Sequence, residues 1–320
     1  MRALKINDLP EKPMGTATPI AGWSGGAVKQ TRQEMIVVSR GARTNVDRRS
    51  FMRGALCAGA ATVAMPALGW LGGTAAASTW RGVIGCIKPR AGDSSLAELI
   101  RLMPDGIGIA VTYLNLTEGT REELASTYPT YEKHIAYLAS QHCDVITLEG
   151  APPFMMLGPA GEAKMVDGWR QKYKVDMFTS SQNHVNAIRA LKLKKILGFA
   201  PFGADLNKTY AKYFEDSGIG VVAMESVNVA YSAIRDVPAE AVYRQVKKQF
   251  LAQTGADGIY ILGSALDALP VVGALEQDLG VPVVQATQAR VWELQRRLHI
   301  RAPVKGYGVL LETLPSAKTS

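Results

Sequence analysis

Two short stretches of the chain end in a glycine that sits next to a residue able to move or donate a proton. Residues 144–150 read DVITLEG and residues 257–263 read DGIYILG, an aspartate, a strand-like run and a glycine in each case. The first stretch has Glu149 immediately before its glycine, and the second has Ser264 immediately after. A carboxylate beside an apolar strand end loses hydration, which raises its pKa and makes it a candidate proton donor or base. The alternative interpretation is a structural glutamate, hydrogen-bonded to backbone or to a lysine.

Main-chain N–H groups at Gly150 and Gly263 are a second source of chemistry. In open α/β sheets ligands lie beyond the carboxyl ends of the strands, so both turns are expected to face a pocket. Two prolines follow Ala151, beginning with Pro152, and prolines cannot donate. The remaining N–H groups there could stabilise a carboxylate or an enediolate. Ser264 has no neighbouring base in the sequence, so a role as hydrogen-bond donor to substrate suits it better than a role as nucleophile.

A helix start forms the third candidate site. The sequence TSSQ at residues 179–182 has the pattern of a capping box. Thr179 and Ser180 would then lie where free N–H groups of the first turn can hold an anion. His184 falls in the same turn and is open to two interpretations, one facing the pocket and one facing solvent.

Motifs of several other chemistries are absent from the sequence. It contains no glycine-rich dinucleotide fingerprint, no phosphate loop and no Gly-x-Ser-x-Gly elbow. The four histidines show no metal-ligand spacing with one another or with cysteine. We therefore expect chemistry without a cofactor or a metal.

The first 77 residues have the character of an export leader. The pair Arg48-Arg49, followed by Phe51 and a second basic residue, resembles the bacterial twin-arginine signal. A weakly apolar run then ends in an A-x-A type site, which predicts cleavage after Ala77. We therefore expect export through the twin-arginine export machinery and a periplasmic mature protein. A permanent membrane anchor is the weaker interpretation, because the run contains proline and several glycines. Met35 is an alternative start to Met1.

Charge and cysteine content limit the remaining classes. The leader holds ten Lys and Arg against four Asp and Glu, so six of the eight net positive charges lie in it and the mature part keeps two. No basic stripe with aromatics follows, which disfavours nucleic-acid binding. Cys86 and Cys143 are predicted to be free, inert core thiols, because their positions along parallel strands are too far apart to bridge.

Beyond the leader, strand and helix patterns alternate, which predicts a parallel sheet covered on both faces. The predicted strands are 81–87, 107–113, 144–148, 174–178, 194–200, 219–224, 258–262 and 281–284, with an edge strand at 304–311. The main predicted helices are 95–102, 118–141 with an interruption near Pro129, 181–191, 205–217, 238–254, 266–279 and 285–298.

Taken together, these segments resemble the aspartate/glutamate racemase superfamily, in its maleate isomerase and arylmalonate decarboxylase branch. The resemblance covers nearly all of residues 81–312. It is carried by DVITLEGAPPFMMLG, TSSQNHVNAIRALKLKKI, APFGADLNKTYAKYFEDSGIGVV, residues 257–292 and the closing KGYG. It implies two similar doubly wound α/β halves with a cleft between them, no cofactor and a small carboxylic acid as substrate. The implied division is 78–184 plus 286–320 for the first half and 185–285 for the second.

The resemblance also implies that this sequence lacks some of the side chains with which the family carries out its reactions. The aspartate spacing puts Gly150 on the first family turn, although counting back from Phe154 puts Glu149 there, and Gly263 stands on the second turn, where relatives bear cysteine. A family tyrosine that binds carboxylate corresponds to Phe202, while Asn207 matches a family asparagine. Because a glycine cannot transfer a proton, the resemblance disfavours two-thiol racemase chemistry as the mechanism here.

Two functions remain. The first is an exported, cofactor-free lyase or isomerase, decarboxylase-like, with Glu149 and Ser264 as catalytic candidates. Its predicted substrate contacts are Pro89, Gly150, Ala151, Pro152, Thr179, Ser180, Phe202, Asn207 and Gly263. The second is a non-catalytic periplasmic protein that binds an organic acid in the same cleft. The oligomeric state is not indicated by the sequence.

Overall fold

The computed structural model describes residues 79–92, 94–227 and 229–314. These residues all lie in one compact unit. The predicted export leader, residues 1–77, lies outside the described residues. Within the described part of the chain, no helix is both long enough and apolar enough to cross a membrane.

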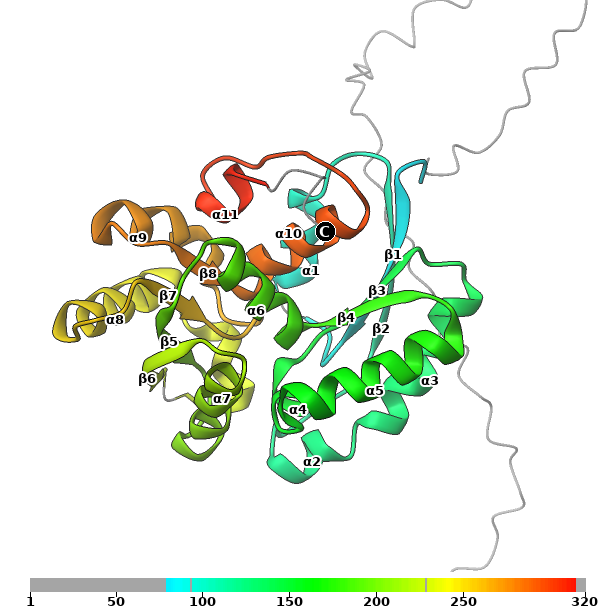
Figure 1. The fold of residues 1–320 in the computed structure, drawn as a ribbon, viewed down its shortest axis with the longest axis horizontal. Coiled ribbons are helices and arrows are strands. Elements are labelled where there is room, and N and C mark those ends of the chain that lie inside the picture. Colours follow the sequence, from blue (N-terminus) through cyan, green and yellow to red (C-terminus); the bar gives the residue numbers. More distant parts are fainter. Residues whose placement is uncertain (1–78, 93, 228, 315–320) are drawn as a thin grey trace, which may run out of the picture. The chain divides into compact units, whose positions relative to one another are not determined.

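Two four-stranded parallel sheets carry the fold (Figure 1). In the first sheet the strand order is β2-β1-β3-β4, and in the second it is β6-β5-β7-β8, which is the same order. The first sheet comprises β1 (Gly82–Lys88), β2 (Ile107–Tyr113), β3 (Val145–Leu148) and β4 (Asp176–Thr179). The second comprises β5 (Lys195–Ala200), β6 (Gly220–Ser226), β7 (Gly258–Ile261) and β8 (Val283–Gln285). The expectation of two similar doubly wound α/β halves is therefore confirmed.

Helices connect the strands in both halves. Those of the first half are α1 (Ser95–Leu102), α2 (Arg121–Ala125), α3 (Tyr128–Ser140), α4 (Ala151–Met155), α5 (Gly158–Tyr173) and α6 (Ser180–Ala190). The later ones are α7 (Ala204–Asp216), η1 (Tyr231–Asp236), α8 (Ala239–Ala252), η2 (Leu269–Val271), α9 (Val272–Leu279), α10 (Ala286–Arg297) and α11 (Val309–Glu312).

The repeated aspartates begin the two halves in the same way. The Asp144 carboxylate accepts a hydrogen bond from the N–H of Val83, at 2.7 Å, where β1 begins. The Asp257 carboxylate accepts from the N–H groups of Lys194 and Lys195, both at 2.9 Å, where β5 begins. Each aspartate thus satisfies main-chain donors at the start of the neighbouring strand, which gives the sequence repeat a structural cause.

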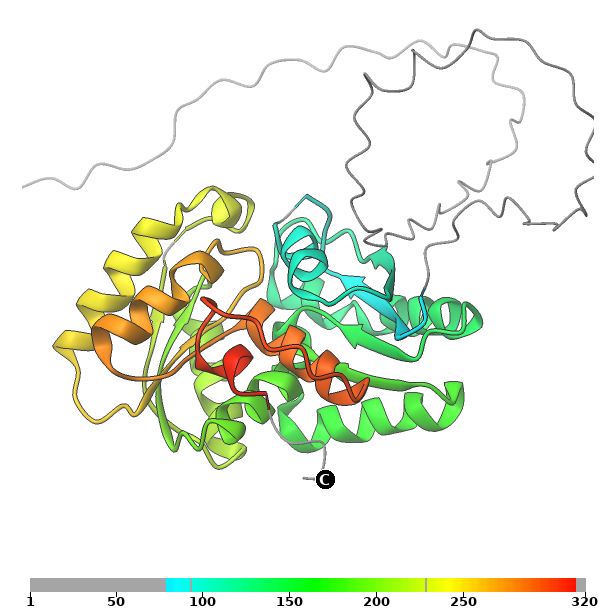
Figure 2. The same cartoon turned by 90° about the horizontal axis from the view of Figure 1, so that it is seen from above.

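Two helices, α6 and α10, join the halves. Each begins with a capping box, at Thr179 and at Gln285, directly after the last strand of its sheet. The two helices contact each other, and α10 also packs on α1 of the first half, as both views show (Figure 2). One hydrophobic core runs through this region and includes Phe178, Tyr260 and Leu294. The division at residues 184 and 286 remains a prediction, since the described residues form one unit.

Three predicted elements differ from the structure. The helix over 118–141, expected with an interruption near Pro129, is divided into α2 and α3 and begins only at Arg121, because the Glu123 carboxylate accepts the N–H groups of the preceding loop, Thr117 to Gly119. The helix after Ser264 begins only at Val272, behind the short η2. The edge strand at 304–311 is wrong: Gly306 and Gly308 have φ of 84° and 87°, which interrupts an extended chain, and α11 forms there.

Candidate active site

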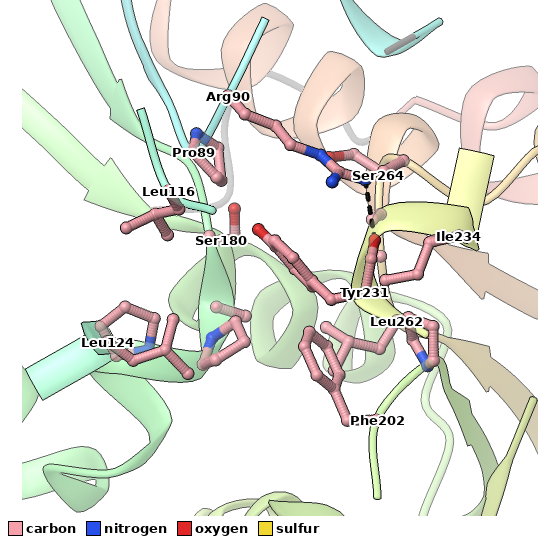
Figure 3. Close-up of a pocket in the computed structure, with 18 of the residues that line it drawn as sticks. Pro89, Arg90, Leu116, Leu124, Ser180, Phe202, Tyr231, Ile234, Leu262 and Ser264 are labelled. Carbon is pink, nitrogen blue, oxygen red and sulfur yellow. Dashed lines mark hydrogen bonds between the residues drawn. The ribbon is translucent and has the colours of Figure 1, made fainter. Parts of the chain in front are cut away.

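One cavity lies beyond the carboxyl ends of β3 and β7, and Figure 3 shows side chains that line it. It encloses about 70 Å³. The lining residues are Pro89, Arg90, Leu116, Leu124, Gly150, Ala151, Pro152, Pro153, Ser180, His184, Pro201, Phe202, Tyr231, Ile234, Leu262, Gly263, Ser264, Ala265 and Ala286. Among the predicted substrate contacts it therefore brings together Pro89, Gly150, Ala151, Pro152, Ser180, Phe202 and Gly263, along with the catalytic candidate Ser264.

The first turn is built around Gly150. Its φ and ψ of 96° and 87° are unfavourable for a residue with a Cβ. A Cβ there would lie 3.0 Å from the Tyr131 hydroxyl and 3.1 Å from Cγ of Pro89. The chain then enters α4 through two prolines, which have no N–H groups. Glycine is thus required by both conformation and space.

The second turn, at Gly263, repeats this geometry. Its φ is 103°, and a Cβ would lie 3.2 Å from Cγ of Pro201. Within the described part of the chain, the N–H groups of Gly150, Gly263 and Ser264 make no hydrogen bond. The turns therefore offer unpaired main-chain donors at the cavity, as carboxylate or enediolate binding requires.

Arg90 is the one charged residue among the described residues that line the cavity. It follows β1 and reaches across to η1 of the other half, where its Nη2 donates to the carbonyl oxygen of Tyr231 at 3.1 Å. Its guanidinium lies 4.5 Å from the centre of the Tyr231 ring, a cation–π arrangement. No carboxylate of the described residues pairs with it, so the cavity has a net positive charge.

His184 lines the cavity and is buried, with 1% of its surface exposed. Its Nδ1 is hydrogen-bonded to the Tyr260 hydroxyl at 2.8 Å, which links α6 of the first half to β7 of the second. Burial, with a smaller contribution from the charge of Arg290, lowers the pKa of His184 to about 3. The imidazole is therefore neutral at physiological pH, and of its two interpretations the pocket-facing one agrees with the structure.

Glu149 does not line the cavity, which corrects its interpretation as an open proton donor. The side chain is fully buried, and its Oε2 pairs with Nζ of Lys88 at 2.9 Å and with Nη2 of Arg290 at 3.0 Å. Its carbonyl oxygen accepts the Tyr131 hydroxyl. Two cations thus hold the carboxylate behind the cavity wall, and the structural alternative fits this geometry.

Thr179 and Asn207 are likewise absent from the cavity lining. The Thr179 hydroxyl caps α6 by accepting from the N–H of Gln182 and donates to the buried Glu162 carboxylate. Asn207 is buried on α7, where its Nδ2 donates to the carbonyl oxygen of Met224 at 3.4 Å. In this structure both side chains hydrogen-bond within the protein, and their assignment as substrate contacts stays a prediction.

Sequence reasoning did not assign Arg90 or Tyr231 to the site. Arg90 had a usable signal, because it directly follows a strand whose end must lie at the pocket edge. Tyr231 gave no sequence signal, because it lies on a short 3₁₀ helix whose sequence has no apolar periodicity.

The cysteines of the described residues lie away from the cavity. Cys86 and Cys143 are both free and buried, as predicted, and neither lines it. Burial raises the pKa of Cys143 to about 11 and that of Cys86 further. The described residues contain no group of three or more His, Cys, Asp or Glu arranged to hold a metal ion.

Comparison with known proteins agrees with this architecture. A family model for arylmalonate decarboxylase matches residues 84–311. The chain belongs to the arylmalonate decarboxylase family. The enzyme of that name from Bordetella bronchiseptica is 25% identical over 231 residues, which cover 72% of this chain and 96% of the relative.

Solved structures of the arylmalonate decarboxylase family and of maleate isomerases share the fold. A liganded double mutant of arylmalonate decarboxylase is 25% identical, with a TM-score of 0.67 over 72% of this chain and 98% of its own. A maleate cis-trans isomerase mutant from Nocardia farcinica, which carries a covalently bound succinylcysteine intermediate, is 20% identical with a TM-score of 0.67 over the same shares. The relatives are decarboxylase and isomerase enzymes, so this chain is a member of an enzyme family.

Proposed function

We propose that the cavity is the active site of a cofactor-free decarboxylase that acts on a small acid bearing two carboxylates on one carbon. The observation that carries this proposal is that the Gly150 and Gly263 turns face one cavity in which Arg90 supplies the only charge of the described lining. An anionic substrate gains from both the cation and the unpaired main-chain donors. The proposal makes use of no metal ligand.

The two carboxylates of such a substrate would meet different surroundings. One is held by Arg90 and the turn amides. The other is directed against apolar side chains such as Leu116, Leu124 and Phe202, where loss of hydration disfavours the charged group. The C–C bond to this carboxylate breaks, CO₂ leaves, and the electron pair passes into the remaining carboxylate as an enediolate, which the amides stabilise. Ser264 donates a hydrogen bond to the bound substrate.

Decarboxylation fits this lining better than isomerisation through a thiol. The Nocardia isomerase mutant forms its succinyl intermediate on a cysteine. No cysteine of the described residues lines the present cavity, and Gly263 stands in the second turn. A route that loses CO₂ requires no sulfur nucleophile and only a proton after the bond has broken.

A second function, binding of an organic acid without turnover, is favoured by one observation. The described lining contains neither a thiol nor a carboxylate, which are common proton carriers. The same cavity would then bind the acid through Arg90 and the turn amides.

We further propose that the protein, with either function, is exported by the twin-arginine route. Replacing Arg48 and Arg49 with lysine and following the protein in cell fractions tests this proposal.

Arg90→Met in the full-length protein tests the site. Release of CO₂ from phenylmalonate and binding of a non-reactive dicarboxylate are measured for the wild type and the variant. Loss of a hydrogen bond to a charged group costs about 1.5–3 kcal/mol, which corresponds to roughly 10- to 100-fold weaker binding. Arg235→Met is the matched control, because Arg235 also bonds the other half, at Gly92, but does not line the cavity.

The outcomes separate the two functions. Turnover by the wild type that Arg90→Met weakens and Arg235→Met does not is the result expected for the enzyme. Saturable, Arg90-dependent binding with no turnover of any malonate or maleate supports the binding protein. Neither turnover nor binding overturns both functions.

A further inference from the structure

We propose that Tyr231 is the proton donor that quenches the carbanion left when CO₂ departs. This inference rests on the proposed decarboxylase function and adds the residue that completes it. The described lining holds no thiol or carboxylate that could act as donor: Gly150 and Gly263 occupy the two turns, and Glu149 is held behind the wall by Lys88 and Arg290.

The candidates are the side chains of the described lining that carry a transferable proton, namely Ser180, Ser264, His184 and Tyr231. Serine hydroxyls are alcohols and very weak acids. His184 is neutral, since burial depresses its pKa, and its remaining N–H is also a weak acid. A phenol, with an ordinary pKa of about 10, is the strongest acid of the four.

The position of Tyr231 suits this role. It begins η1 of the second half, and its ring extends across the cavity so that the hydroxyl points toward Ser180 of the first half (Figure 3). A substrate held between the two glycine turns therefore lies in the path of this hydroxyl.

Three contacts fix the ring. Arg90 lies over it at 4.5 Å from its centre, and Phe202 packs beside it with ring centres 6.3 Å apart. Gly119 closes a further side, because a Cβ there would lie only 2.7 Å from Cδ2 of Tyr231. These contacts limit the ring to one orientation, which a proton donor must have if it is to reach a single face of the carbanion.

In the proposed protonation step, Tyr231 gives a proton to the α-carbon and water supplies the proton that replaces it. The α-carbon takes the phenolic proton, the O–H electron pair stays on oxygen as tyrosinate, and the new C–H bond consumes the electron pair of the enediolate. Arg90 stabilises the tyrosinate, because it is a cation beside the ring that gains the negative charge. Water returns a proton to Tyr231, and the hydroxide formed combines with CO₂ as bicarbonate. Arg90 is in this step a positioning residue.

Tyr231→Phe in the full-length protein tests the donor. The substrate is a prochiral malonate with one phenyl and one methyl group on the α-carbon, and the enantiomeric excess of the monoacid product is measured together with kcat. Tyr210→Phe is the matched control, because Tyr210 also packs on Phe202 but does not line the cavity. Binding of a non-reactive dicarboxylate and the melting temperature show that the variants fold.

We expect the wild type and Tyr210→Phe to give one enantiomer in excess. We expect Tyr231→Phe to give racemic product, since water then delivers the proton, with kcat lowered about 10²-fold or more where protonation limits turnover. Enantiomeric excess that survives in Tyr231→Phe, or racemic product from the wild type, overturns the inference and leaves decarboxylation intact.

Should Tyr231→Phe not fold, 3-fluorotyrosine at position 231 replaces it. A more acidic phenol must move the alkaline limb of kcat to lower pH, and an unmoved limb overturns the inference. No CO₂ release by the wild type means that the proposed function itself has failed.

Discussion

Gly150 and Gly263 occupy equivalent positions in the two halves and face the same cavity. Each follows the third strand of its sheet, each has a positive φ, of 96° and 103°, and each lies against a proline that follows the first strand, Pro89 or Pro201. The cavity is thus framed by one structural motif used twice, with main-chain donors on both sides.

Gly150→Ala and Gly263→Ala are expected to destabilise the protein by about 1–3 kcal/mol each, because a residue with a Cβ is strained at these φ values. Both substitutions also press on the facing proline and so disturb the turn amides, which should lower turnover as well. Chemical denaturation measures the first effect and CO₂ release the second. Gly168→Ala, on the exposed face of α5 with open space around it, should instead stabilise by about 0.5–1 kcal/mol. Unchanged stability in both turn variants would contradict the strain argument.

Glu149→Gln is expected to cost about 3–5 kcal/mol, because it leaves Lys88 and Arg290 buried without their anion. Urea denaturation of the variant and wild type gives the difference. The control is Glu132→Gln, which removes an ion pair between partly exposed Glu132 and Lys172 and should cost no more than about 1 kcal/mol. A variant as stable as the wild type but without turnover would restore Glu149 as the catalytic group.

Thiol reagents should leave the activity unchanged. Cys86 and Cys143 are buried, and burial raises the pKa of both, so almost no reactive thiolate forms near neutral pH. The measurement is CO₂ release before and after treatment with N-ethylmaleimide, with mass spectrometry to count modified residues. Inactivation that coincides with labelling of either cysteine would argue for a thiol-dependent reaction.

The fold was predictable where the sequence satisfies local requirements of the backbone. Asp144 and Asp257 bind main-chain N–H groups of the neighbouring strand, and Thr179 begins α6 with a capping box, so these residue types recur at fixed positions. The site was predictable to the extent that it consists of strand ends, since Gly150 and Gly263 can be assigned from position alone.

The sequence could not decide between the two interpretations of Glu149, because its surroundings depend on partners distant in the chain. Lys88 comes from β1 and Arg290 from α10, and only the packing of α10 on the first half brings the three charges together. Tyr231 was missed for a related reason, since a short 3₁₀ helix leaves no periodic signal and its contact with Arg90 forms only between the halves. Sequence patterns therefore predict local backbone hydrogen bonding well, and they predict contacts between side chains distant in the chain poorly.

His184 should make the protein less stable in acid. Its pKa falls from about 6.5 in the unfolded chain to about 3 in the folded protein, because the neutral ring is buried and faces the charge of Arg290. The unfolded chain therefore binds the proton more readily, so the stabilisation is complete above pH 6.5 and is lost as the pH falls toward 3. Each pH unit in this window removes about 1.4 kcal/mol, for a total of about 5 kcal/mol between pH 6.5 and pH 3.

The contribution of His184 is isolated by comparing urea denaturation of the wild type and His184→Gln from pH 7 to pH 4. Because other carboxyl groups titrate in the same range, only the difference between the two proteins is informative. The wild type should lose stability more steeply than His184→Gln as the pH falls, whereas His299→Asn, at an exposed histidine, should follow the wild type. Parallel curves for the wild type and His184→Gln would mean that the imidazole is not held neutral between Tyr260 and the cavity.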